Sequence, residues 1–151
     1  MSHVPSRGPV QQARVRARRN AVQALYQWDM TSAAVEHVMA EFEAERTELR
    51  KADLEYFREL LLGVSAHQEE LRQQLLPCLS RPLGELDPVE RVILYLGTYE
   101  LLYRPELPWR VVINESIDLA KLFGAEQSHR FINGVLDAVA RSVRAVEIGA
   151  A

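Results

Sequence analysis

Residues 110–139 read RVVINESIDLAKLFGAEQSHRFINGVLDAV, and this stretch decides the fold class. Its first half favours a helix from about Arg110 to Phe123, with Gly124 as the C-terminal cap. Ser128 is well placed to cap a second helix. Apolar residues at helical spacing form the core-facing stripe of that second helix: Phe131, Val135, Leu136 and Val139. Two helices joined by a short turn are therefore predicted.

The rest of the chain carries the same helical pattern. Four further helices are predicted: from Gln11 to about Met30, from a cap at Thr31 or Ser32, from Asp53 towards Leu75, and from Asp87-Pro88 to Tyr103. No stretch alternates polar and apolar residues between hairpin turns, so strands are not expected. We predict an all-α single domain of six or seven helices over residues 11–146. A flexible arm is predicted at residues 1–10 and a tail at residues 147–151.

Charge is distributed unevenly along the 151 residues. The chain has 18 basic and 21 acidic side chains, a formal net charge of -3. Residues 1–20 contain no acid and five arginines: Arg7, Arg14, Arg16, Arg18 and Arg19. The other 131 residues hold 13 basic and 21 acidic side chains, a net -8. A basic head on an acidic body indicates a polyanionic partner for the head.

Four of these arginines surround the start of the first predicted helix. With Leu25 at the centre of the apolar face, Arg14 and Arg18 fall within about 20° of that centre. Arg16 and Arg19 lie on the other side. A buried, unpaired guanidinium is costly, so this end of the helix is expected to leave the core and meet solvent or an anion.

Two interpretations of this basic end remain open. Arginine binds phosphate bidentately and stacks on bases, which favours a nucleic-acid surface. Single-stranded RNA is favoured over duplex DNA, because nothing in the chain resembles a motif that reads a DNA groove. The alternative is a solvated helix end whose arginines pair with the acidic segment at residues 36–59.

Several classes of protein are excluded by what the sequence lacks. The single Cys78 cannot form an intramolecular disulfide, and no apolar run approaches the ~20 residues of a membrane span. Residues 1–20 do not resemble a signal peptide, so a cytoplasmic protein with no membrane association is expected. The histidines show no metal-ligand spacing, and the adjacent Ser128 and His129 cannot act as nucleophile and base. We expect no enzyme, no metal and no cofactor.

Longer motifs carry a family resemblance. Residues 112–121, 123–126 and 128–137 resemble the signature of the NusB family of bacterial transcription antitermination factors. Segments elsewhere agree with it: residues 18–28, residues 56–58 and residues 90–94. The resemblance extends from about Arg14 to Asp137.

The resemblance implies an all-helical fold of two small packed bundles, and a non-catalytic RNA-binding adaptor. Such proteins pair with NusE, which is ribosomal protein S-ten, and the pair binds the single-stranded boxA element of nascent RNA. With other Nus factors and RNA polymerase, the pair suppresses termination, notably on ribosomal RNA operons.

The resemblance also implies site residues. Those expected to contact RNA are Arg14, Arg16, Arg18 and Arg19 at the first helix, and Phe123, Ser128, Arg130 and Phe131 around the turn before the last long helix. Tyr26 and Glu90 match positions associated with the NusE interface. Gln127 stands where many relatives have an acid, and Cys78 where some have an aromatic residue.

Two alternatives compete with the adaptor. A NusB-like domain also occurs at the N-terminus of some RNA cytosine methyltransferases, although this sequence has no nucleotide-binding glycine motif. The second alternative is a structural homodimer whose arginine face is masked.

Overall fold

The computed structural model describes residues 8–149, and all regular structure in that part of the chain is helical. It contains eight α-helices: α1 (Pro9–Met30), α2 (Val35–Glu45), α3 (Leu54–Ala66), α4 (Gln68–Leu75), α5 (Pro88–Tyr103), α6 (Trp109–Phe123), α7 (Ser128–Val143) and α8 (Ala145–Ile148). Three short 3-10 helices join them: η1 (Thr47–Lys51), η2 (Leu76–Cys78) and η3 (Leu83–Glu85). The all-α prediction is confirmed, with more helices than the six or seven expected.

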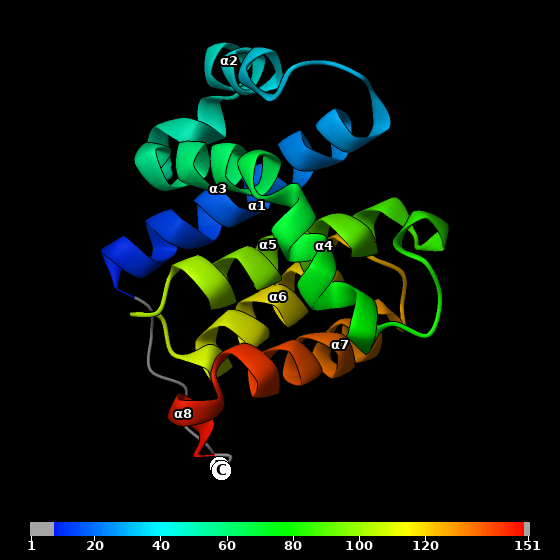
Figure 1. Cartoon of the computed structure of the whole chain (residues 1–151). Coiled ribbons are helices and arrows are strands. Elements are labelled where there is room, and N and C mark those ends of the chain that lie inside the picture. Colours follow the sequence, from blue (N-terminus) through cyan, green and yellow to red (C-terminus); the bar gives the residue numbers. More distant parts are fainter. Residues whose placement is uncertain (1–7, 150–151) are drawn as a thin grey trace.

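The helices form two packed bundles (Figure 1). Helices α1, α2 and α3 pack on one another in the upper half of Figure 1, and α5, α6 and α7 in the lower half. Helix α4 packs on α5 and α7. Contacts of α1 and α3 with α5 join the bundles, as the resemblance implied.

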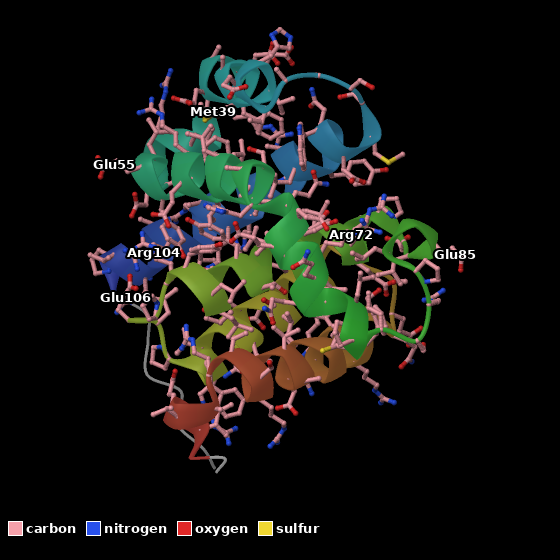
Figure 2. The ribbon with its side chains drawn as sticks, viewed as in Figure 1. Met39, Glu55, Arg72, Glu85, Arg104 and Glu106 are labelled. Carbon is pink, nitrogen blue, oxygen red and sulfur yellow. The ribbon has the colours of Figure 1, made fainter. Side chains whose placement is uncertain are left out.

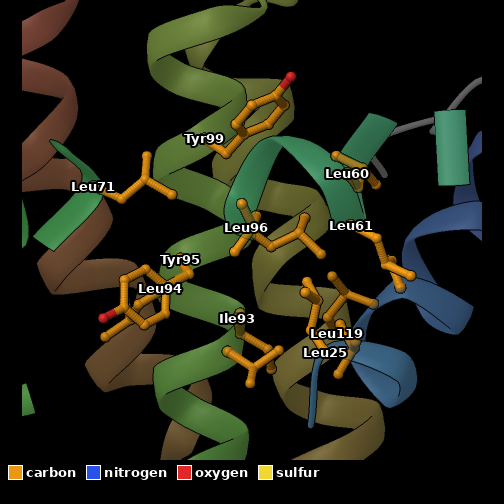
Figure 3. Packing of buried hydrophobic residues seen from close by; sticks show 14 of the residues in the cluster. Leu25, Leu60, Leu61, Leu71, Ile93, Leu94, Tyr95, Leu96, Tyr99 and Leu119 are labelled. Carbon is orange, nitrogen blue, oxygen red and sulfur yellow. The ribbon is translucent and has the colours of Figure 1, made fainter. Parts of the chain in front are cut away.

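One apolar core runs through both bundles (Figure 3). Leu25 from α1, Leu61 from α3 and Leu96 from α5 are each at most 1% exposed. Burial of one such leucine contributes about 1.5–3 kcal/mol. This shared core fixes α1, which carries the arginines, against α5.

The helix start predicted at Asp87-Pro88 is confirmed, and Asp87 is the N-cap. Its carboxylate accepts a hydrogen bond from the backbone N–H of Val89 at 2.9 Å, and Pro88 begins α5. Asp53 caps α3 in the same way, accepting from the N–H of Tyr56 at 3.0 Å. These caps were predictable because the side chain and its partner lie within three residues.

The helix predicted from Asp53 to Leu75 is wrong in one respect, because the chain breaks at His67. Helix α3 packs on α1, whereas α4 packs on α5 and α7, and a straight helix cannot follow both surfaces. The ring of His67 stacks on that of Tyr103, with 4.4 Å between centroids. The break accounts for one of the additional helices, and the short α8 for another.

Two predicted N-caps are also wrong. The Thr31 hydroxyl donates back to the carbonyl of Gln27 at 2.9 Å and so closes the end of α1. The N-cap of α2 is Ala34, so neither Thr31 nor Ser32 caps that helix. Ser128 is the first residue of α7, is 4% exposed, and makes no cap hydrogen bond. Gly124 does follow α6 as predicted. A Cβ at this position would lie 2.8 Å from the Cβ of Ser128, so the close packing of the turn requires a glycine.

The predicted arm and tail lie partly outside the described residues. Residues 1–7 and 150–151 are not described, whereas Pro9 and Val10 already belong to α1, and Glu147 and Ile148 belong to α8. Among residues 8–149, no helix combines the length and apolar character needed to cross a membrane.

Candidate nucleic-acid interface

The four arginines of α1 divide between two faces, as the helical spacing predicted. Arg18 is buried and Arg14 is half-buried, on the side of α1 that faces α3 and α5. Arg19 is exposed and Arg16 is half-buried on the opposite side. Spacing alone therefore separated these side chains correctly.

The expectation that this end of the helix leaves the core is wrong for Arg18. Its side chain is 5% exposed, and Nε donates to Oε2 of Glu100 at 3.0 Å. Glu100 is fully buried on α5, and Glu115 of α6 lies 3.8 Å from Nη1 of Arg18. The guanidinium is tolerated in the core because a carboxylate neutralises it there. Arg18 thus presents no guanidinium to a ligand.

Tyr56 of α3 completes this buried cluster. Its hydroxyl donates to Oε2 of Glu100. Burial and the nearby Glu100 carboxylate raise the pKa of Tyr56, which keeps the phenol protonated as a donor. The guanidinium of Arg104 packs over the Tyr56 ring at 4.8 Å and pairs with Glu59 at 2.6 Å (Arg104 is labelled in Figure 2). Helices α1, α3 and α5 thereby meet in one polar network.

Arg14 is only partly available. Its side chain is 27% exposed, its Nε lies 3.7 Å from Oδ2 of Asp53, and its guanidinium packs over the Tyr56 ring at 4.6 Å. Asp53 also donates its backbone N–H to the carbonyl of Ala13 at 3.0 Å. These contacts tie the start of α3, and the η1 turn just before it, to the side of α1.

Arg16 and Arg19 line a basic groove between α1 and η1. The groove has a volume of about 660 Å³, and its lining is Arg16, Arg19 and Asn20 from α1 with Thr47, Glu48, Arg50 and Lys51 from η1. Within residues 8–149, no ion pair engages the four basic side chains of this lining, which are Arg16, Arg19, Arg50 and Lys51. This volume falls in the range of about 300–1,000 Å³ that is common for ligand sites. The sequence reasoning missed Arg50 and Lys51, whose only signal was a basic pair inside an acidic segment.

A second, more apolar hollow lies further along α1. It has a volume of about 490 Å³ and includes Tyr26 of α1, Phe42 of α2, Val89 of α5 and Phe123 of α6. Phe123, predicted to contact RNA, and Tyr26, predicted to contact NusE, therefore share one surface. Glu90, the other predicted NusE contact, is half-buried and follows Val89 in the first turn of α5.

The basic groove and the apolar hollow adjoin each other. Arg46 lines the hollow and donates to the side chain of Gln23, another lining residue, at 2.6 Å. Thr47, the next residue in the chain, lines the basic groove. The two concave surfaces thus meet at the end of α2.

The remaining predicted residues do not gather in the groove. Ser128 is buried against Gly124, so its role in the described structure is to shape the turn between α6 and α7. Arg130 is exposed on α7. Phe131 is half-buried, and the guanidinium of Arg81 lies 5.9 Å from its ring. No group of three or more potential metal ligands occurs in residues 8–149.

Comparison with known proteins decides the family. The model of the NusB family matches residues 15–141. The chain belongs to the NusB family. It is 52% identical to transcription antitermination protein NusB of Nitrosococcus oceani over 134 residues, which cover 89% of each chain. The NusB of Halorhodospira halophila is 53% identical over 138 residues, covering 90% of this chain and 88% of that protein.

Solved NusB structures share the fold. T. maritima NusB is 30% identical with a TM-score of 0.75, covering 89% of this chain and 96% of that one. A crystal structure of the antitermination factors NusB and NusE in complex with dsRNA gives 28% identity and a TM-score of 0.72, covering 87% and 98%. These matches confirm the family and the fold predicted from the C-terminal signature. This NusB-family chain is a transcription antitermination protein and not an enzyme.

Proposed function

We propose that this NusB-family protein binds single-stranded boxA-type RNA together with NusE and suppresses termination by RNA polymerase. The observation that carries the proposal is the outward face of α1, where Arg16 and Arg19 line a groove and no ion pair within residues 8–149 engages them. Such guanidinium groups bind phosphate oxygens bidentately. The solved relative that contains NusB, NusE and dsRNA supports RNA and NusE as partners.

The arginines of α1 take different roles in this proposal. Arg16 and Arg19 bind phosphates, and Arg14 adds charge through its exposed part. Arg18 does not touch RNA. Its guanidinium is buried against Glu100 and stabilises the packing of α1 on α5.

The apolar hollow supplies the other contacts. Phe123 offers a ring on which an unpaired base can stack. Tyr26, which is 39% exposed, and Glu90, which follows Val89 of the hollow in the chain, contact NusE. Arg130 adds an exposed positive charge on α7. The protein thus serves as an adaptor that needs no cofactor.

Other Nus factors and RNA polymerase complete the antitermination complex in this proposal, notably on ribosomal RNA operons. The complex forms in the bacterial cytoplasm, where nascent RNA is made.

Fluorescence anisotropy with labelled boxA RNA and scrambled RNA, with and without NusE, tests this proposal. Each single-strand phosphate contact contributes about 0.7 to the slope of log K against log salt concentration. With the affinity at about 1 M salt as the reference, loss of two contacts in Arg16→Ala/Arg19→Ala should weaken binding about 25-fold at 0.1 M salt. The matched control Arg72→Ala/Arg141→Ala removes two exposed charges that do not line the groove. It should bind RNA like the parent protein.

The outcomes separate the parts of the proposal. Unchanged binding by Arg16→Ala/Arg19→Ala would remove the proposed site. Equal affinity for boxA and scrambled RNA in the presence of NusE would remove the boxA assignment. Arg18→Met should retain RNA binding, since its guanidinium points into the core.

A further inference from the structure

The η1 side of the basic groove has no part in the contacts proposed so far. Arg50 and Lys51 are exposed and face Arg16 and Arg19 across the groove. Resting on the proposed function, we infer that Arg50 and Lys51 form a sequence-independent clamp for the phosphodiester backbone of single-stranded RNA. The α1 face then binds RNA as one wall of a two-walled site.

Charge is the first argument for the clamp. Four basic side chains and one acid, Glu48, line the groove, so its local charge is +3 in a chain whose total is -3. Like charges that line one groove repel one another unless an anion lies between them. A run of phosphates supplies negative charge at regular spacing along such a groove.

The second argument is that the walls are held in place before any ligand arrives. The backbone N–H of Asp53, two residues after Lys51, donates to the carbonyl of Ala13 on α1. The carboxylate of Asp53 pairs with Arg14 on the same helix, and Leu49 of η1 is 5% exposed in the core. A preformed site loses less entropy when it binds its ligand.

The third argument concerns what the groove lacks. None of its seven lining residues is aromatic, so bases find no stacking platform there. The lining therefore suits phosphate, and the aromatic residues lie in the adjoining hollow.

The test compares Arg50→Ala/Lys51→Ala with Arg72→Ala/Arg141→Ala, which lowers the net charge equally. Arg72 lies on α4 (Figure 2) and Arg141 on α7, and neither lines the groove. Loss of two phosphate contacts should weaken RNA binding about 25-fold at 0.1 M salt and about 10-fold at 0.2 M. The control should follow the parent protein at both salt concentrations.

Two further arms make the result specific to a backbone clamp. Arg50→Ala/Lys51→Ala should weaken boxA and scrambled RNA by the same factor, because phosphate contacts carry no sequence information. Glu48→Gln should strengthen binding severalfold, since it removes the acid that repels phosphate. A gain in affinity cannot result from a misfolded protein.

Three results would overturn the clamp: parental binding by Arg50→Ala/Lys51→Ala, an equal loss in the control, or a loss confined to boxA RNA. The first would leave the groove to another ligand, such as an acidic protein segment. In each case RNA binding that depends on Arg16 and Arg19 would still support the proposed function. If the parent protein binds no RNA, the proposed function fails, and the clamp fails with it.

Discussion

Removal of the charge from Glu100 is the sharpest test of the buried network. Glu100→Gln keeps the size of the side chain but leaves the guanidinium of Arg18 buried without its main counter-ion. Loss of one partner of a buried ion pair costs about 3–5 kcal/mol. Glu115, at 3.8 Å, offers partial compensation, so we expect a loss of about 3 kcal/mol. For a chain of this size, that lowers Tm by roughly 6–12 °C.

Urea and thermal unfolding followed by far-UV circular dichroism measure this loss. A double-mutant cycle with Arg18→Met isolates the interaction between the two side chains. The double variant Arg18→Met/Glu100→Gln should be more stable than Glu100→Gln alone, because no buried charge is left uncompensated. A parallel RNA-binding measurement on Arg18→Met should show parental affinity.

Two results would refute this reasoning. A cost below about 1 kcal/mol for Glu100→Gln is the value of an exposed pair and would mean that water reaches Arg18. Strictly additive effects in the cycle would mean that the two side chains are not coupled.

Two further predictions concern packing and pH. Gly97→Ala places a Cβ 2.8 Å from Cδ1 of Leu136 and 2.9 Å from Oγ of Ser116, so urea denaturation should show a loss of about 1–3 kcal/mol, and a variant as stable as the parent would contradict this close packing. Because burial and Glu100 raise the pKa of Tyr56, the unfolded chain ionises this phenol near pH 10 while the folded protein keeps it neutral. The contribution of Tyr56 to the free energy of unfolding should therefore be fully present below about pH 10. Above that pH it should fall by up to ~1.4 kcal/mol per pH unit. Denaturation between pH 9 and 11 should show a shallower decline for Tyr56→Phe, and parallel curves would contradict the assignment.

The sequence predicted a helix start or end correctly where the residues that determine it lie within a few positions of one another. The cap at Asp87 and the stop at Gly124 are of this kind. Helical spacing also placed Arg14 and Arg18 on the inner face of α1 correctly. In each case, the deciding geometry belongs to a single helix or turn.

The errors arose where the deciding partner is distant in sequence. Glu100 lies 82 residues from Arg18 in the sequence, and no residue close to Arg18 in the chain predicts a buried carboxylate partner. The break at His67 depends on surfaces that α3 and α4 meet only after the bundles have packed. The basic groove requires η1 to fold back on α1, so the contribution of Arg50 was not visible from spacing.

The Arg18–Glu100 pair also has a consequence for distances across the molecule. Apolar contacts between helices are non-directional, whereas a guanidinium–carboxylate pair fixes both distance and angle. Arg16 lies within one turn of Arg18 on α1, and Glu90 lies on the same helix as Glu100. The protein therefore holds its basic groove and the surface around Glu90 at a constant spacing. A single assembly that touches both surfaces has to match that spacing.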